Sequence, residues 1–268
     1  MKRVHTISQL FSPSPRKKNG RLLAIFAHPD DESILIGGLL SRAHAEGIQT
    51  HVLCMTNGEL GGTKSGVSAA RLASIRKKEL HHAAEILGIC RIITPGLPDG
   101  SLFYKTPAAK RIISSAITAV RPSLVITHDP SGITNHPDHI TVSALTKRVV
   151  AAKKLHAPLL YVVVLGTKEK KFRLSLEVTA KNWHSMPPAT HNIPLRQYHA
   201  QKMHACLAHK SQQLQSVYGI NRLVWYRFFD SEYLHLVNLS VSCRYIFSSY
   251  RAADLKFDAR NKKTVWSV

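Results

Sequence analysis

Short apolar runs recur along the chain and alternate with segments that have the periodicity of a helix. The apolar runs cover residues 22–27, 50–56, 91–94, 124–127 and 159–165. No polar residue interrupts the first run, which is typical of a parallel strand buried on both faces. One helical pattern follows the first run. Three further helical patterns cover residues 68–87, 107–120 and 137–155. This alternation predicts an α/β protein.

Residues at the ends of the helical segments support the prediction. Gly88 follows the 68–87 segment in the position of a C-cap, and Pro107 opens the 107–120 segment. Both residues are common at these places in helices. We therefore expect a Rossmann-like, doubly wound and mainly parallel sheet that is flanked by helices.

The alternation weakens after about residue 166. We expect two edge strands at residues 172–183 and 191–194, a long helix at 195–218, and a further strand at 224–237. These elements would add C-terminal strands and a helix to the parallel sheet.

The sequence predicts one domain with an appended segment at each end. Residues 1–20 contain Ser, Pro, Lys and Arg but no acidic residue, and are expected to form a flexible basic leader. Residues 21–239 are expected to form a single domain. Residues 240–268 show no clear pattern and are expected to form a C-terminal extension.

Sequence features also bear on the compartment and the assembly. No apolar run reaches the length of a membrane span, and residues 1–20 lack the long apolar stretch of a signal peptide. The isolated cysteines indicate reduced thiols and not a disulfide framework; they are Cys54, Cys90, Cys206 and Cys243. We therefore expect a cytoplasmic protein, and the sequence leaves a homo-oligomer open.

The chain is strongly basic. Its 37 Lys and Arg residues against 16 Asp and Glu residues give a formal net charge of +21 with His neutral. Such a surplus favours anionic partners, or else it serves only to keep the surface soluble. Nothing in the sequence resembles a zinc finger or an aromatic RNA-binding signature, so no nucleic-acid partner is expected.

Acidic and imidazole side chains gather where the first predicted strand ends. Pro29 cannot donate a ladder hydrogen bond, so the strand should stop near His28. Asp30, Asp31 and Glu32 follow at once. In open α/β sheets, ligands bind at this carboxyl edge.

A second stretch repeats this pattern. The predicted strand at 124–127 runs into a short loop, which is followed by His136, Asp138 and His139. The tripeptide His-Pro-Asp thus occurs at residues 28–30 and again at 136–138. If both strands belong to one parallel sheet, the two stretches converge at one edge.

This convergence predicts a metal site. A catalytic zinc usually has three protein ligands and an open position for water, and His28, Asp31 and His139 form such a set. The set would also accept other divalent first-row metals. Two carboxylates side by side, Asp30 and Asp31, allow one to hold the metal and the other to take a proton from the bound water. Helix-capping acids and surface histidines are the alternative for either stretch alone, but two stretches at two strand ends favour the metal site.

The two stretches resemble the signatures of a known family. Residues 27–32, Ala-His-Pro-Asp-Asp-Glu, and 136–139, His-Pro-Asp-His, are similar to the motifs of the LmbE-like, or PIG-L, family of zinc-dependent N-deacetylases. The resemblance covers roughly residues 20–235. Weaker family-like pieces are Thr56 to Glu59, Arg76 with Glu79, Leu97 to Gly100, Lys202 with Ala205, His209, Ser211 and Gln212, and Glu232.

The resemblance implies roles that agree with the chemistry of the residues. Asp30 is expected to be the general base, and His136 to stabilise the tetrahedral oxyanion. Asp138 is expected to orient His136 and hold it protonated. Arg76 and Asp99 are expected to bind the hydroxyl groups of a sugar.

We therefore expect a hydrolase that removes an N-acetyl group from a glucosamine-type sugar or its conjugate. The basic surface suggests that the conjugate is anionic. Two alternatives stay open: a metal-dependent amidase that acts on a non-sugar amide, and a non-catalytic module that binds an anion on the same fold. The intact set of His28, Asp30, Asp31, His136 and His139 argues against the second alternative.

Overall fold

The computed structural model describes residues 1–11, 20–61, 66–164, 186–212, 230–240, 255–258 and 263–266. The chain forms two compact units, residues 1–237 and residues 238–268. The second unit begins near the start of the predicted C-terminal extension. It contains β9 (Leu255–Asp258) and β10 (Lys263–Trp266), which pair antiparallel.

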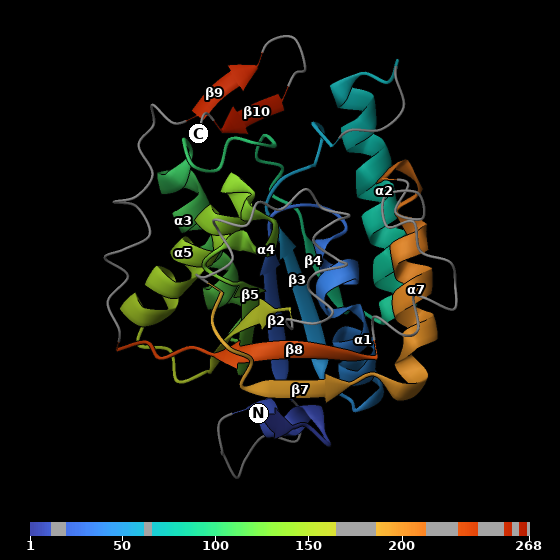
Figure 1. Cartoon of the computed structure of the whole chain (residues 1–268), viewed down its shortest axis with the longest axis vertical. Coiled ribbons are helices and arrows are strands. Elements are labelled where there is room, and N and C mark those ends of the chain that lie inside the picture. Colours follow the sequence, from blue (N-terminus) through green and yellow to red (C-terminus); the bar gives the residue numbers. More distant parts are fainter. Residues whose placement is uncertain are drawn as a thin grey trace. The chain divides into compact units, whose positions relative to one another are not determined.

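An eight-stranded sheet forms the centre of the first unit (Figure 1). Its order is β1-β7-β8-β6-β5-β2-β3-β4. The strands are β1 (Lys2–Arg3), β2 (Arg21–Phe26), β3 (Gln49–Cys54), β4 (Arg91–Ile93), β5 (Leu124–His128), β6 (Leu159–Val163), β7 (His191–Pro194) and β8 (Ser231–Leu236). Neighbours from β4 through β6 pair in parallel, whereas β8 is antiparallel to both β6 and β7. The predicted mainly parallel sheet is confirmed.

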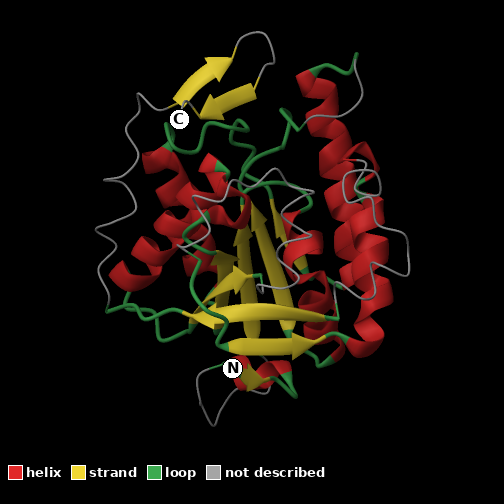
Figure 2. Ribbon diagram, in the orientation of Figure 1, coloured by secondary structure: helices red, strands yellow, loops and turns green. Residues whose placement is uncertain are grey.

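Helices cover both faces of this sheet (Figures 1 and 2). One side carries α1 (Asp31–Ala45), α2 (Ala69–Leu87) and α7 (His199–Ala208). The other side carries α3 (Thr106–Val120) and α5 (Pro137–Ala152), with the short α4 (Gly132–Asn135) before α5. Three short 3-10 helices complete the described part of the unit: η1 (Ile7–Leu10), η3 (Arg196–Tyr198) and η4 (Lys210–Gln212).

The hydrophobic pattern explains this layered arrangement. A parallel strand with helices on both faces has no side turned to water, so apolar residues occupy every position. Leu22 to Phe26 of β2 accordingly have 0% exposure. The helix ends also agree with the sequence: the Ser68 hydroxyl accepts a hydrogen bond from the Arg71 amide at 3.3 Å, and Gly88 ends α2 with φ at 68°.

The N-terminal segment differs from its prediction. Residues 2 and 3 pair in parallel with His191 and Asn192, so β1 lies at the edge of the sheet. Val4, Ile7 and Leu10 are buried because their spacing turns all three towards the core. Residues 1–11 are therefore packed and not a flexible leader, and β7 has a neighbour on each side and is not an edge strand.

The C-terminal part of the first unit is only partly as expected. The helix predicted at 195–218 is shorter, because α7 ends at Ala208 and η4 follows. The strand predicted at 224–237 corresponds to β8. The strand predicted at 172–183 lies outside the described residues, as do residues 213–229. Within the described ranges, no helix has the length and apolar character needed to cross a membrane.

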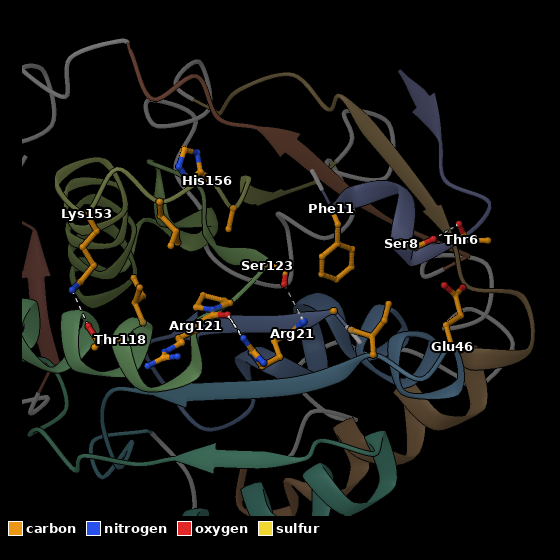
Figure 3. A pocket seen from close by; sticks show the side chains of 16 residues that line it. Thr6, Ser8, Phe11, Arg21, Glu46, Thr118, Arg121, Ser123, Lys153 and His156 are labelled. Atoms are coloured by element: carbon orange, nitrogen blue, oxygen red, sulfur yellow. Dashed lines mark hydrogen bonds between the residues drawn. The ribbon is translucent and has the colours of Figure 1, made fainter. Parts of the chain in front are cut away.

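A pocket lies at the amino edge of the sheet, where β2 and β5 begin (Figure 3). Its lining includes Phe11, Arg21, Arg121, Ser123 and Lys153. The Arg21 guanidinium donates to the Arg121 carbonyl at 3.0 Å, and the Lys153 ammonium donates to the Thr118 hydroxyl at 2.8 Å. All the predicted site residues lie beyond the other end of the strands, so this pocket is separate from them.

Candidate metal centre

The two stretches that carry the His-Pro-Asp tripeptides meet at the carboxyl edge of the sheet. Strands β2 and β5 pair directly, with Leu22 opposite Leu124. His28 follows the end of β2, and Asp31 begins α1. His139 lies in the first turn of α5. Parallel pairing therefore places side chains from residues 28 and 139 at one site, as the sequence predicts.

The three predicted metal ligands lie close together. Nδ1 of His28 is 3.0 Å from Nε2 of His139. Carboxylate oxygens of Asp31 lie 3.9 Å from Nδ1 of His28 and 3.4 Å from Nε2 of His139. The three residues are all less than 9% exposed. Two imidazole nitrogens and a carboxylate at such separations are a donor set that suits zinc and related divalent metals.

A second contact fixes which nitrogen of His139 faces the cluster. Nδ1 of His139 lies 2.9 Å from the Gly132 carbonyl, which can only accept a hydrogen bond. The proton is therefore on Nδ1, and Nε2 has a free lone pair for a metal. Gly132 has φ at 68°, and a Cβ at this position would lie 2.8 Å from Cβ of His139. Only glycine allows the carbonyl to approach this closely.

His128 also lies beside the predicted ligands, although no role for it was expected from the sequence. This fully buried residue ends β5, and its Nε2 is 3.4 Å from Oδ2 of Asp31. Its ring stacks on His139, with centroids 4.0 Å apart. Its place directly after an apolar strand was the signal that could have found it. Among the described residues, Asp31, His128 and His139 form one of three groups whose ligand atoms could hold a metal, and His28 with His136 and His139 forms a second.

The opposite nitrogen of His28 faces two carboxylates. Nε2 of His28 is 2.9 Å from Oδ1 of Asp99 and 3.3 Å from Oδ2 of Asp138. Burial opposes the charged form of His28, but the hydrogen bonds to Asp138 and Asp99 hold its pKa well above the usual value. The carboxylates therefore favour positive charge at this site, which fits a metal cation.

Asp30 lies next to the predicted ligands and has an unusual backbone. Its φ of 119° and ψ of −26° place a non-glycine residue in the positive-φ region, at a cost on the order of 1–3 kcal/mol. Oδ2 of Asp30 is 3.2 Å from Nη2 of Arg76. Burial raises the pKa of Asp30 to about 6, although the Arg76 guanidinium opposes the rise. A carboxyl with such a pKa can exchange protons near neutrality.

His136 and Asp138 do not interact in the way expected from the sequence. The Asp138 carboxylate accepts hydrogen bonds from the amides of Gly100 and Leu102, at 2.8 and 3.0 Å, and so holds that loop. Burial and the nearby His28 lower the pKa of His136 to about 4, even though Asp138 raises it. The expectation that Asp138 holds His136 protonated is therefore not supported by this arrangement.

The two predicted sugar-binding residues also reach the site. Arg76 is 3% exposed and donates to the Gly58 carbonyl at 2.8 Å and to the Pro29 carbonyl. Asp99 is 9% exposed, and besides His28 it accepts a hydrogen bond from the Leu60 amide at 3.1 Å. Arg76 and Asp99 thus also hold the backbone of the loops around the site through these hydrogen bonds.

The fold and this cluster define an α/β protein with a candidate metal centre at the carboxyl edge of its sheet. Comparison with known proteins gives the family. Residues 23–150 match the family model PIG-L, described as GlcNAc-PI de-N-acetylase. A relative from Bacillus anthracis, a probable N-acetyl-alpha-D-glucosaminyl L-malate deacetylase, is 30% identical over an alignment of 211 positions that covers 77% of this chain and 87% of the relative. The chain belongs to the PIG-L family.

Solved structures show the same fold. The N,N'-diacetylchitobiose deacetylase of Pyrococcus horikoshii matches with a TM-score of 0.60 and 21% identity, over 82% of this chain and 84% of that one. The 4-carboxy-2-hydroxymuconate hydratase of Pseudomonas putida matches with a TM-score of 0.59 and 18% identity, over 83% of this chain and 98% of that one. The fold alone therefore does not determine the reaction.

Proposed function

We propose that this protein is a metal-dependent hydrolase that removes the N-acetyl group from a glucosamine-type sugar or its conjugate. The observation that carries the proposal is the convergence of His28, Asp31 and His139, whose facing atoms are 3.0 to 3.9 Å apart, beside the partly buried carboxyl of Asp30. The deacetylase relatives support the choice of an N-acetyl group as the target.

His28, Asp31 and His139 would hold the metal, and Zn²⁺ is the ion that we favour. When bound, it would polarise the amide carbonyl and make water a better nucleophile. Nδ1 of His139 is committed to Gly132, and an Asp31 oxygen accepts from the His28 amide at 2.9 Å. These contacts hold two of the three ligands in place before any ion arrives.

Asp30 would be the general base. Its carboxylate must be ionised to accept a proton from water, and a pKa of about 6 leaves most of it ionised at neutral pH while keeping it more basic than an exposed Asp. The Arg76 guanidinium beside it fixes one oxygen and leaves the other to take the proton. The same carboxyl can then return that proton to the departing amine.

His136 would stabilise the charge that develops on the carbonyl oxygen. Its Nδ1 accepts a hydrogen bond from the Asp138 amide at 3.2 Å, so in the neutral ring the proton is on Nε2. A neutral imidazole with this tautomer presents one N–H donor, which is what an oxyanion needs. The role predicted from the sequence is retained here, but with a neutral and not a protonated ring.

Arg76 and Asp99 are the residues that we propose for sugar binding. Asp99 lies 2.9 Å from His28, and Arg76 lies 3.2 Å from Asp30, so both are next to the proposed chemistry. The net charge of +21 favours a conjugate that carries negative charge. The buried free thiols of Cys54 and Cys206 agree with a reducing compartment, so we place the protein in the cytoplasm.

The test is a measurement of acetate release. Zinc-loaded protein is incubated with N-acetylglucosamine and with neutral and anionic N-acetylglucosamine conjugates, with Asp30→Asn as the matched inactive control. We expect acetate and free amine in equal amounts from at least one conjugate. If fully metal-bound protein releases acetate from no N-acetylated sugar but hydrolyses other amides, the alternative amidase is correct.

A further inference from the structure

Asp30 has a positive φ, and its backbone amide contacts Glu32, which lies two residues further along the chain. The Asp30 amide donates a hydrogen bond to Oε2 of Glu32 at 3.1 Å. Because φ is 119° at a residue that has a Cβ, this conformation persists only where surrounding contacts enforce it. Glu32 supplies such a contact, and it is only 1% exposed.

The Glu32 carboxylate is in turn held from a distant part of the chain. Oε1 of Glu32 accepts a hydrogen bond from the Ser33 hydroxyl at 2.6 Å and faces Nε2 of His209 at 2.9 Å. A carboxylate can only accept, so Nε2 of His209 carries the proton. Ser33 is the next residue and moves with Glu32, whereas His209 comes from the end of α7 and fixes the carboxylate against another element.

The surroundings of His209 hold its ring against Glu32. Its side chain has 0% exposure. Its other ring nitrogen, Nδ1, is buried and has no hydrogen-bond partner among the described residues. Ser211 then ties the segment to α2, through its amide and hydroxyl to the two carboxylate oxygens of Glu79 at 2.7 and 2.6 Å. Nε2 of this buried ring is 2.9 Å from Glu32 and 3.4 Å from the Ser33 hydroxyl, so its nearest polar partner is Glu32.

We infer that His209 and Glu32 form a positioning pair for Asp30, in which the His209 N–H fixes the Glu32 carboxylate and Glu32 fixes the Asp30 backbone. This inference rests on the proposed function, because it takes Asp30 as the general base. Neither residue belongs to the proposed ligand set. Asp31 has its own contact with the His28 amide, so the pair acts on the base and leaves the ligands in place.

The consequence of losing His209 follows from this chain of contacts. Without the ring, Glu32 can turn away, and the Asp30 amide loses its acceptor, which is one of the contacts that hold its backbone. The backbone then relaxes and carries the Asp30 carboxylate away from its place beside Arg76. Turnover should fall while metal content and substrate affinity stay the same, because the change affects proton transfer and not the binding of either partner.

The experiment compares His209→Ala with His209→Gln and with the matched control His204→Ala, an exposed histidine on the same helix. For His209→Ala we expect kcat to fall by about 10–100-fold, the usual scale for residues that do not touch the substrate but hold a residue that does. We expect KM and metal content to be unchanged. A glutamine side chain still offers an N–H to Glu32, so His209→Gln should recover most of the loss, and His204→Ala should behave as the unmodified protein.

A readout that needs no substrate accompanies the kinetics. Hydrogen–deuterium exchange of the peptide that covers residues 28–34 should be faster in His209→Ala than in either other variant, with exchange elsewhere unchanged. A double-mutant cycle completes the test: in an Asp30→Asn background, His209→Ala should lower the residual rate no further.

The outcomes separate this inference from the proposed function. If the unmodified protein releases no acetate, the proposed function is wrong, while the exchange data still test the contact between His209 and Glu32. The inference is overturned if His209→Ala releases metal, lowers the rate by the same factor with and without the Asp30→Asn substitution, or leaves exchange at residues 28–34 unchanged. If His209→Ala does not fold, Glu32→Gln carries the same tests, since an amide cannot accept from both Asp30 and His209 as a carboxylate does.

Discussion

The two His-Pro-Asp tripeptides have the same sequence but different structures and different places in the proposed mechanism. In the first, at 28–30, the histidine faces His139 in the candidate metal centre, and the aspartate precedes α1 with φ at 119°. In the second, at 136–138, the histidine is the N-cap of α5, and the aspartate is a fully buried residue of its first turn. In the function that we propose, the first tripeptide would supply a metal ligand and the general base. The second would supply the oxyanion donor, and its aspartate holds the 100–102 loop.

The position of the following helix explains this difference. Pro29 precedes α1, so His28 still extends from the strand and Asp30 lies between the strand and the helix. Pro137 is already the first residue of α5, so His136 is outside the helix and Asp138 is inside it. The side chain that lies at the candidate metal centre in the second stretch is therefore His139, one residue beyond the tripeptide. Identical residues acquire different chemistry because the backbone points them differently.

The largest expected contrast is in metal content. His28→Ala removes one of three proposed ligands, and metal analysis after dialysis should show a sharp loss of bound zinc. His136→Ala should keep its metal and lose kcat by about 10²–10³-fold, the usual effect of one oxyanion donor. Loss of metal from His136→Ala, with retention in His28→Ala, would reverse the roles of the two tripeptides.

Substitution of Asp30 should lower the turnover rate, whereas substitution of Asp138 should lower the stability of the fold. Asp30→Asn cannot take up the water proton, so we expect kcat to fall by about 10²–10⁴-fold with metal content and Tm unchanged. Asp138→Asn keeps one acceptor oxygen for the two amides of the 100–102 loop, and should lower the free energy of unfolding by about 1–3 kcal/mol. Thermal unfolding and kcat, measured for both variants, decide this. Equal effects of the two substitutions on Tm would contradict the contrast.

A smaller effect is expected at His128, which lies beside Asp31 but outside the ligand set that we propose. His128→Phe keeps a stacked ring on His139 and removes the nitrogen that is 3.4 Å from Asp31. We expect metal affinity to weaken by about 10-fold, the lower end of the range for residues that contact a ligand. Competition with a zinc chelator measures this affinity. Complete loss of metal would instead make His128 a ligand.

The smallest expected effect concerns charge. If the sugar conjugate is anionic, kcat/KM should fall as salt is raised, because the screening length shortens to about 8 Å at physiological ionic strength. A neutral conjugate measured in the same series is the control. Equal salt dependence of the two substrates would show that the net charge of +21 serves solubility alone.

The sequence determined the parts of this molecule that depend on neighbouring residues. The apolar runs predict β2 to β6, and the reason is clearest for β2, because a strand buried on both faces requires apolar residues. Ser68 and Gly88 mark the ends of α2, because capping is a local interaction. The convergence of His28 and His139 could also be predicted from the sequence, because parallel strands bring their carboxyl ends to one edge of the sheet.

Only the tertiary structure decided what depends on contacts between distant segments. The pairing of residues 2 and 3 with β7, the approach of His128 to Asp31, and the contact of His209 with Glu32 join residues that are far apart in the chain. No local pattern of hydrophobic and polar positions specifies such a contact, because periodicity reports which face of an element is buried and not what it is buried against. The division of roles between two identical tripeptides was settled in the same way, by the strand and helix on either side of each.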